Sequence, residues 1–110
     1  MVAIIQLWIN IMHRNIKILD CTLRDGGYVN NWGFSKFQIS KITDSLDKSN
    51  IDIIELGYLN DKRGRRENST LFDSISAVDN ILSDTPNNLT RVVMIDLFAF
   101  DVDKLPQKND

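Results

Sequence analysis

The chain has 110 residues, of which 43% are hydrophobic and 25% are charged, an ordinary composition for a globular domain. Its net charge of −2 gives no reason to expect nucleic acid as a partner. The single cysteine, Cys21, excludes an internal disulfide framework and fits a reducing cytoplasm, where we expect the protein to reside.

The first twelve residues are mostly apolar, and we expect them to be an extension that precedes a domain over residues 13–110. The apolar stretch is interrupted by Gln6 and Asn10, and it is shorter than the ~20 residues of a membrane span. It also lacks the basic start and cleavage site of a signal peptide. We therefore expect no membrane partner, with Met12 as the native start. The alternative is a genuine N-terminal helix or strand that covers the end of the fold.

Three short apolar runs predict strands, at residues 16–21, 51–56 and 92–95. The second run is broken only by Asp52, which is typical of a parallel strand covered on both faces. Helical patterns separate the three runs. The alternation of strand and helix favours an α/β fold with parallel strands and right-handed crossovers.

Two helices are predicted from apolar residues spaced three and four apart. The first follows a good N-cap at Ser35 and stops near Asn50. The second follows Ser69 or Thr70. Their apolar faces comprise Ile39, Ile42 and Leu46 in the first helix, and Leu71, Ile75, Val78 and Leu82 in the second.

The polar run after the first strand contains the clearest functional pattern. It reads LDCTLRDGGY from Leu19 to Tyr28, and its two glycines permit a sharp turn. The guanidinium of Arg24 can bind an enolate or carboxylate oxygen, and the carboxylate of Asp25 can hold a hard divalent cation. From composition alone, a surface ion pair on a polar loop over residues 24–33 is the simpler interpretation.

Together with Ile18, this decamer resembles the signature of the DRE-TIM metallolyase superfamily, also called HMGL-like or pyruvate carboxyltransferase-like. The resemblance is nearest to 4-hydroxy-2-oxovalerate aldolase-like proteins and covers the chain from about Ile16 onward. It implies the N-terminal part, about three βα units, of a TIM (β/α)8 barrel, which takes ~250 residues when complete. The matching residues are Asp20, Thr22, Leu23, Arg24, Asp25 and Gly26, with Glu55 on the second strand.

The resemblance also implies an activity: a divalent-metal-dependent aldolase or lyase that breaks or forms a C–C bond next to a 2-oxo acid. Asp25 would ligate Mg²⁺ or Mn²⁺, Arg24 would neutralise the enolate oxygen, and Glu55 would position Arg24. Tyr28 stands where the hydroxy-oxovalerate aldolases carry a histidine base, although a tyrosine with a pKa of ~10 is a poorer base at neutral pH. The family's metal-binding His-x-His is absent from this chain, whose single histidine, His13, precedes the first strand.

Three functions stay open. The first is the aldolase or lyase. The second is an acyl-CoA-condensing synthase or a biotin-dependent carboxyltransferase of the same superfamily. The third is a truncated, non-catalytic fragment. Because three strands cannot close a barrel, we expect the isolated chain to self-associate through its exposed sheet edges, and the full-length protein to be a possible oligomer.

Two further positions are candidates for binding the small-molecule substrate. Arg63 and Arg65 belong to a charged run over residues 61–68 that could hold an anionic tail, although such runs are usually solvated loops. Asp96 closes the third strand, at the end of the sheet where barrel enzymes place catalysis.

Overall fold

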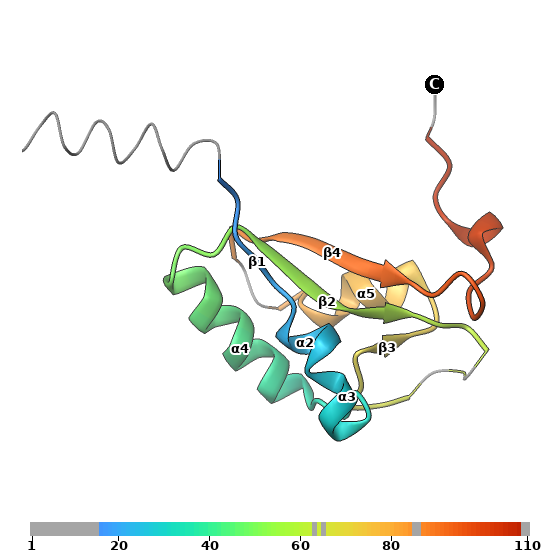
Figure 1. Cartoon of the computed structure of the whole chain (residues 1–110), viewed down its shortest axis with the longest axis horizontal. Helices are drawn as coiled ribbons and strands as arrows, with labels where there is room; N and C mark the ends of the chain where they lie inside the picture. The colour runs from blue at the N-terminus through green and yellow to red at the C-terminus, as the bar shows by residue number, and fades with distance from the viewer. Residues whose placement is uncertain (1–15, 63, 65, 85–86, 109–110) are drawn as a thin grey trace, which may run out of the picture.

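The structure is a computed structural model that describes residues 16–62, 64, 66–84 and 87–108 (Figure 1). These residues form a small α/β fold in which every pair of neighbouring strands is parallel. The predicted α/β class and parallel strand order are therefore confirmed. The expected extension over residues 1–12 lies outside the described residues. No helix within the described ranges is long and apolar enough to cross a membrane.

The sheet is organised around its longest strand, β2 (Ile53–Leu59). Strand β4 (Thr90–Ile95) pairs with β2 along one side. On the other side, β1 (Leu19–Asp20) pairs with the beginning of β2 and β3 (Leu71–Phe72) pairs with its end. Two short strands thus share one edge of β2, with β1 beside its beginning and β3 beside its end (Figure 1). Because β1 ends before β3 begins along this edge, the connecting segments can enter the space beyond the end of β1.

The strands differ from the prediction in length and number. β1 is shorter than residues 16–21, because the chain turns into a helix directly after Cys21. The second strand begins and ends later than the predicted 51–56, the third begins earlier than the predicted 92–95, and β3 was not predicted at all. Leu71, which was expected on a helix, is instead a buried strand residue that pairs with Tyr58.

The helices follow local sequence signals where these are strong. α4 (Lys36–Lys48) begins after Ser35, as predicted, and the hydroxyl of Ser35 accepts from the backbone of Gln38 in a capping box that was not predicted. α5 (Ile75–Ile81) begins later than expected, because its N-cap is Ser74 rather than Ser69 or Thr70. Two short helices, α2 (Thr22–Asp25) and α3 (Gly27–Asn30), replace the predicted loop, and a 3-10 turn, η1 (Val102–Lys104), follows the last strand.

One face of the sheet carries the hydrophobic core. Ile54, Leu56 and Leu59 of β2 are completely buried there. They pack in one cluster with Ile39 of α4 and Val78 of α5. The helices therefore cover this face, and functional side chains on β2 can only project from the other.

An extra residue in β2 changes which side chains project from that other face. Glu55 and Tyr58 are three residues apart, but they lie opposite Val92 and Met94, which are two residues apart in β4. This is a β-bulge, and because side chains alternate along a strand it places Tyr58 on the same face as Glu55. Without the bulge, Tyr58 would point toward the core.

Gly57 makes the bulge possible. Its φ of +150° is a conformation that side chains with a Cβ rarely adopt, and a Cβ at this position would lie 1.9 Å from the carbonyl oxygen of Thr70. The next residue, Tyr58, donates its backbone N–H to that same oxygen at 3.0 Å. Glycine is therefore required here both by backbone angle and by the close approach of the neighbouring chain.

Candidate functional site

α2 places Arg24 beyond the carboxyl end of β1, where its guanidinium meets Glu55 in the first half of β2. Arg24 Nε donates to Glu55 Oε2 at 2.8 Å, and the two side chains are only 21% and 8% exposed. This hydrogen bond raises the pKa of Arg24 above its usual range, so the side chain stays charged. The ion pair expected from the sequence is therefore present, and it fixes the plane of the guanidinium.

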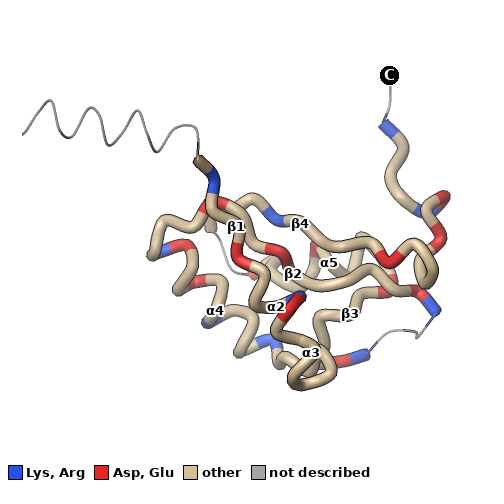
Figure 2. Tube along the Cα trace, viewed as in Figure 1, with Lys and Arg blue, Asp and Glu red and all other residues tan. Residues whose placement is uncertain are grey.

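Asp25 lies on the outer side of the same guanidinium. Its Oδ1 accepts from Arg24 Nη1 at 3.3 Å, and its side chain is 63% exposed. Figure 2 shows this pair of opposite charges on α2, beside β2. The guanidinium has five N–H donors, which is more than its contacts with Glu55 and Asp25 use, so it can also bind a ligand oxygen.

The backbone of α2 is held by two side chains from other parts of the chain, the half-buried Trp32 and the buried Thr70. Trp32 Nε1 donates to the carbonyl of Arg24 at 2.7 Å. The hydroxyl of Thr70 donates to the carbonyl of Leu23 at 2.8 Å, and the Thr70 N–H donates to the carbonyl of Trp32 at 3.0 Å. Trp32 thus anchors this segment, and these hydrogen bonds fix the backbone that carries Arg24.

Two tyrosines meet above Arg24. The hydroxyls of Tyr28 and Tyr58 lie 3.3 Å apart, and Arg24 Cζ is 5.9 Å from the ring centre of Tyr58. The ring of Trp32 contacts both tyrosines edge-on, with centroid distances of 4.8 Å and 5.7 Å. The hydrogen bond with Tyr58 raises the pKa of Tyr28 above its ordinary value of 10.0, which favours the neutral hydroxyl. A ligand oxygen here would meet the neutral hydroxyl of Tyr28 rather than a phenolate.

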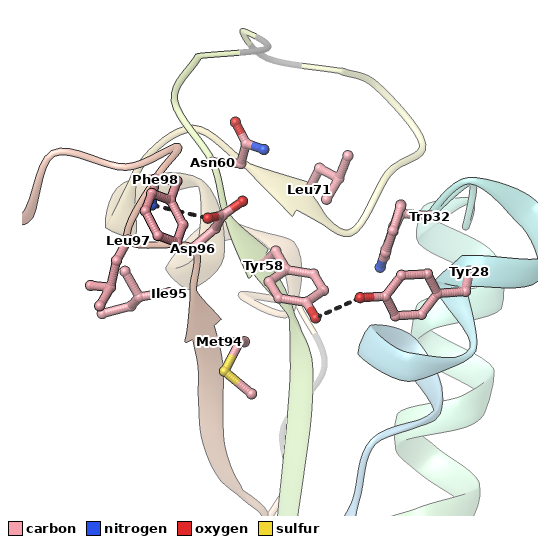
Figure 3. A pocket seen from close by; sticks show the side chains of 10 residues that line it. All are labelled: Tyr28, Trp32, Tyr58, Asn60, Leu71, Met94, Ile95, Asp96, Leu97 and Phe98. Carbon is pink, nitrogen blue, oxygen red and sulfur yellow. Dashed lines mark hydrogen bonds between the residues drawn. The ribbon is translucent and has the colours of Figure 1, made fainter.

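Beyond the tyrosines lies a pocket of about 490 Å³, between α3 and the end of β4 (Figure 3). A volume of this size is typical of small-molecule sites. Asp96 lies in the pocket wall opposite Tyr28 and Trp32 (Figure 3). The lining residues are Tyr28, Trp32, Tyr58, Asn60, Leu71, Met94, Ile95, Asp96, Leu97 and Phe98.

No family model matches this chain, and neither a curated protein nor a solved structure matches it. The inference of function therefore depends on the geometry of these side chains and on the resemblance of the signature sequence.

The structure brings most of the predicted site residues to one end of the sheet. Arg24, Asp25 and Glu55 are in direct contact, and Tyr28 and Asp96 border the adjoining pocket from opposite walls. The predicted Arg63 and Arg65 lie outside the described residues. The clustering agrees with the rule that parallel strands gather functional groups at their carboxyl ends.

Sequence reasoning missed Tyr58 and Asn60. Both follow the bulge in β2, and simple alternation from Glu55 would have placed each of them on the core face. The available signal was Gly57, because an isolated glycine within a strand pattern suggests a bulge.

The donors in the described residues do not complete a metal site. Asp25 offers one exposed carboxylate, which is already in contact with Arg24. In the described part of the chain, no group of three His, Cys, Asp or Glu side chains is close enough to hold an ion. Since Mg²⁺ requires near-octahedral oxygen coordination, Asp25 could supply only one of several ligands.

Proposed function

We propose that this chain carries the enolate-binding part of an aldolase or lyase that breaks or forms a C–C bond next to a 2-oxo acid. The observation that supports the proposal is the contact of Arg24, beyond the carboxyl end of β1, with the buried Glu55 of β2, beside an open pocket. The signature resemblance points the same way. In this proposal the parallel sheet is the first part of a TIM barrel.

Arg24 is the group that binds the reacting oxygens. When the bond next to the 2-oxo acid breaks, its electron pair remains on the substrate as an enolate, and negative charge develops on the former carbonyl oxygen. A guanidinium whose orientation is fixed before the reaction stabilises this charge without rearranging. Glu55 is a positioning residue in this scheme, because it holds Nε while the outer N–H groups face the substrate.

The hydroxyls of Tyr28 and Tyr58 are suited to moving a proton. Cleavage of a 4-hydroxy-2-oxo acid releases a proton from the hydroxyl as the aldehyde forms, and the enolate carbon later takes one up. At 3.3 Å, one tyrosine hydroxyl can accept a proton while passing its own to the other. Such a pair moves a proton without holding a net charge.

A divalent cation, Mg²⁺ or Mn²⁺, is part of the proposal with Asp25 as one ligand. Its remaining ligands would be oxygens of the substrate, of water and of residues other than those described. In this proposal, the roles in binding the substrate and in moving the proton are described for the protein side chains only.

The test is the binding of oxalate, a planar analogue of the pyruvate enolate, to the full chain with Mn²⁺ present. Arg24→Lys keeps the charge but loses the planar pair of donors, so we expect oxalate affinity to fall by about 10-fold or more in calorimetry. Arg91→Lys, which alters an exposed arginine on β4, is the control and should leave affinity unchanged. Equal affinity in wild type and Arg24→Lys, or no binding by the wild type, would refute the proposal.

A further inference from the structure

The pocket continues directly from the proposed enolate site. Tyr58 separates the two: its ring lies over the guanidinium of Arg24, and its side chain also lines the pocket. A substrate with its carboxylate and enolate oxygens at Arg24 would pass the hydroxyls of Tyr28 and Tyr58 and extend its remaining carbons toward β4 (Figure 3). The pocket is thus placed to hold the part of the substrate beyond the reacting bond.

The far wall of the pocket presents a carboxylate. One oxygen of Asp96 accepts from the backbone N–H of Phe98 at 3.1 Å. The other oxygen points away from Phe98, toward the space beside Asn60 and Tyr58 (Figure 3). A negatively charged acceptor at this place attracts hydrogen-bond donors and repels an anionic tail.

A second polar side chain lies next to Asp96, with its oxygen pointing away from that carboxylate (Figure 3). Asn60 is 8% exposed, and its Oδ1 is a buried oxygen without a hydrogen-bond partner among the described residues. Buried polar atoms in proteins are nearly always paired, so an unpaired one at a pocket wall indicates a role for a bound molecule. Rotation about the terminal torsion of the asparagine, which is soft, turns the amide toward the pocket.

The rest of the lining is aromatic and aliphatic. Leu71 and Met94 lie on the sheet side, and the rings of Tyr28 and Trp32 form the opposite wall (Figure 3). Among the described residues that line the pocket, none is a lysine or an arginine. A phosphate or a second carboxylate would therefore meet Asp96 without a compensating charge, whereas a neutral hydroxyl would find an acceptor.

We propose that this pocket selects 2-oxo acids whose carbon chain carries a hydroxyl beyond carbon 4, with Asp96 accepting from that hydroxyl and the amide of Asn60 donating to its oxygen. The substrate class is then a neutral-tailed, polyhydroxylated 2-oxo acid. This inference rests on the proposed function, because Arg24 must bind the acid end for the tail to reach Asp96.

Calorimetry on the full chain with Mn²⁺ tests the inference by comparing two acids. 4,5-Dihydroxy-2-oxopentanoate differs from 4-hydroxy-2-oxopentanoate only in the terminal hydroxyl. We expect the wild type to bind the dihydroxy acid about 10-fold more tightly, the value of one hydrogen bond to a charged acceptor. Pyruvate, which lacks the tail, reports on the Arg24 end alone.

Two variants test which side chains cause the preference for the dihydroxy acid. Asp96→Asn keeps an oxygen for the Phe98 N–H but turns an NH₂ group toward the pocket, so the preference should disappear while pyruvate affinity is unchanged. Asn60→Leu should reduce the preference and leave the melting temperature unchanged or higher, because it removes an unpaired buried oxygen. Asp44→Asn, in an exposed ion pair with Lys48, is the control and should keep the full preference.

The outcomes separate the two proposals. If the wild type binds pyruvate and both acids but prefers neither acid, the hydroxyl-selecting role is wrong and the enolate site stands. Retention of the preference by Asp96→Asn would also overturn that role. If neither pyruvate nor either acid binds, the proposed function fails, and this inference fails with it.

Discussion

The two walls of the pocket are built by different means. On the α2–α3 side, side chains make the defining contacts: Glu55 holds Arg24, the indole of Trp32 holds the backbone of α2, and Thr70 holds the residue before Arg24. Several of these side chains join segments more than 30 residues apart in sequence. This wall therefore depends on the identity of particular residues.

On the β4 side, the backbone makes most of the contacts. Asp61 donates its N–H to the carbonyl of Ala99 at 2.8 Å, and Asp96 donates its N–H to that of Leu59 at 3.3 Å. The side chains of Leu97 and Phe98 are 72% and 88% exposed. The comparison indicates that the first wall fixes the reacting groups. The second wall keeps its shape when its side chains are substituted, so it is the place where substrate specificity can change.

The largest effect on the first wall is expected from Gly57→Ala. The new Cβ would overlap the carbonyl oxygen of Thr70 and would force a strained backbone angle. We expect a loss of about 3 kcal/mol in the free energy of unfolding, measured by urea denaturation. Gly64→Ala is the control: its φ is +68° but nothing lies within 4 Å of the added carbon, so a loss of about 1 kcal/mol is expected. Similar losses in both variants would show that strain alone, and not the contact with Thr70, matters.

A smaller effect is expected for Thr70→Val, which keeps the shape but removes the hydroxyl that binds Leu23. Because the Leu23 carbonyl loses a buried partner, unfolding should become easier by about 1–2 kcal/mol, and oxalate affinity should fall as α2 loosens. Thr43→Val removes a similarly buried hydroxyl that binds Ile39 within α4. It should cost less and leave oxalate affinity unchanged. Equal effects on affinity would contradict the role of Thr70 in holding the site.

Substitutions on the β4 side should have the smallest effect on stability, and that effect should depend on pH. Lys104 contacts Asp61 at 2.6 Å and holds the pKa of Asp61 below its ordinary value of 3.8. A carboxylate with a lowered pKa stabilises the fold above its unfolded pKa, and that stabilisation is lost as the pH falls through the folded one. Asp61→Asn should therefore melt below wild type near neutral pH, and the difference should vanish in acid below pH 3.8.

Asp84→Asn is the matched control for that pH series, because Asp84 and its partner Lys36 are both well exposed. Its melting temperature should differ less from wild type at every pH. A difference for Asp61→Asn that persists unchanged into acid would show that the pair with Lys104 does not contribute.

The sequence predicted those parts of the fold whose signals are local. α4 was correct at its start because Ser35 and Gln38 form a capping box within four residues. The start of α5 was wrong because Leu71 fits a helical spacing as well as a strand, and only its pairing with Tyr58 decides between them. The contact of Arg24 with Glu55 came from a motif, whereas the contact of Tyr28 with Tyr58 depends on a strand irregularity whose sequence signal is a single glycine, Gly57.

The bulge at Gly57 also constrains how this strand can change length. If β2 kept its length but paired with β4 in a regular register, every side chain beyond Gly57 would exchange faces. Leu59 would then turn outward, and Tyr58 and Asn60 would enter the hydrophobic core among the helices. Removing Gly57 would not have this effect, because Tyr58 would then follow Glu55 by two residues and stay on the same face of a regular strand. Homologous chains that keep the pocket should therefore have either the bulge with its glycine or a strand that is one residue shorter between Glu55 and Tyr58.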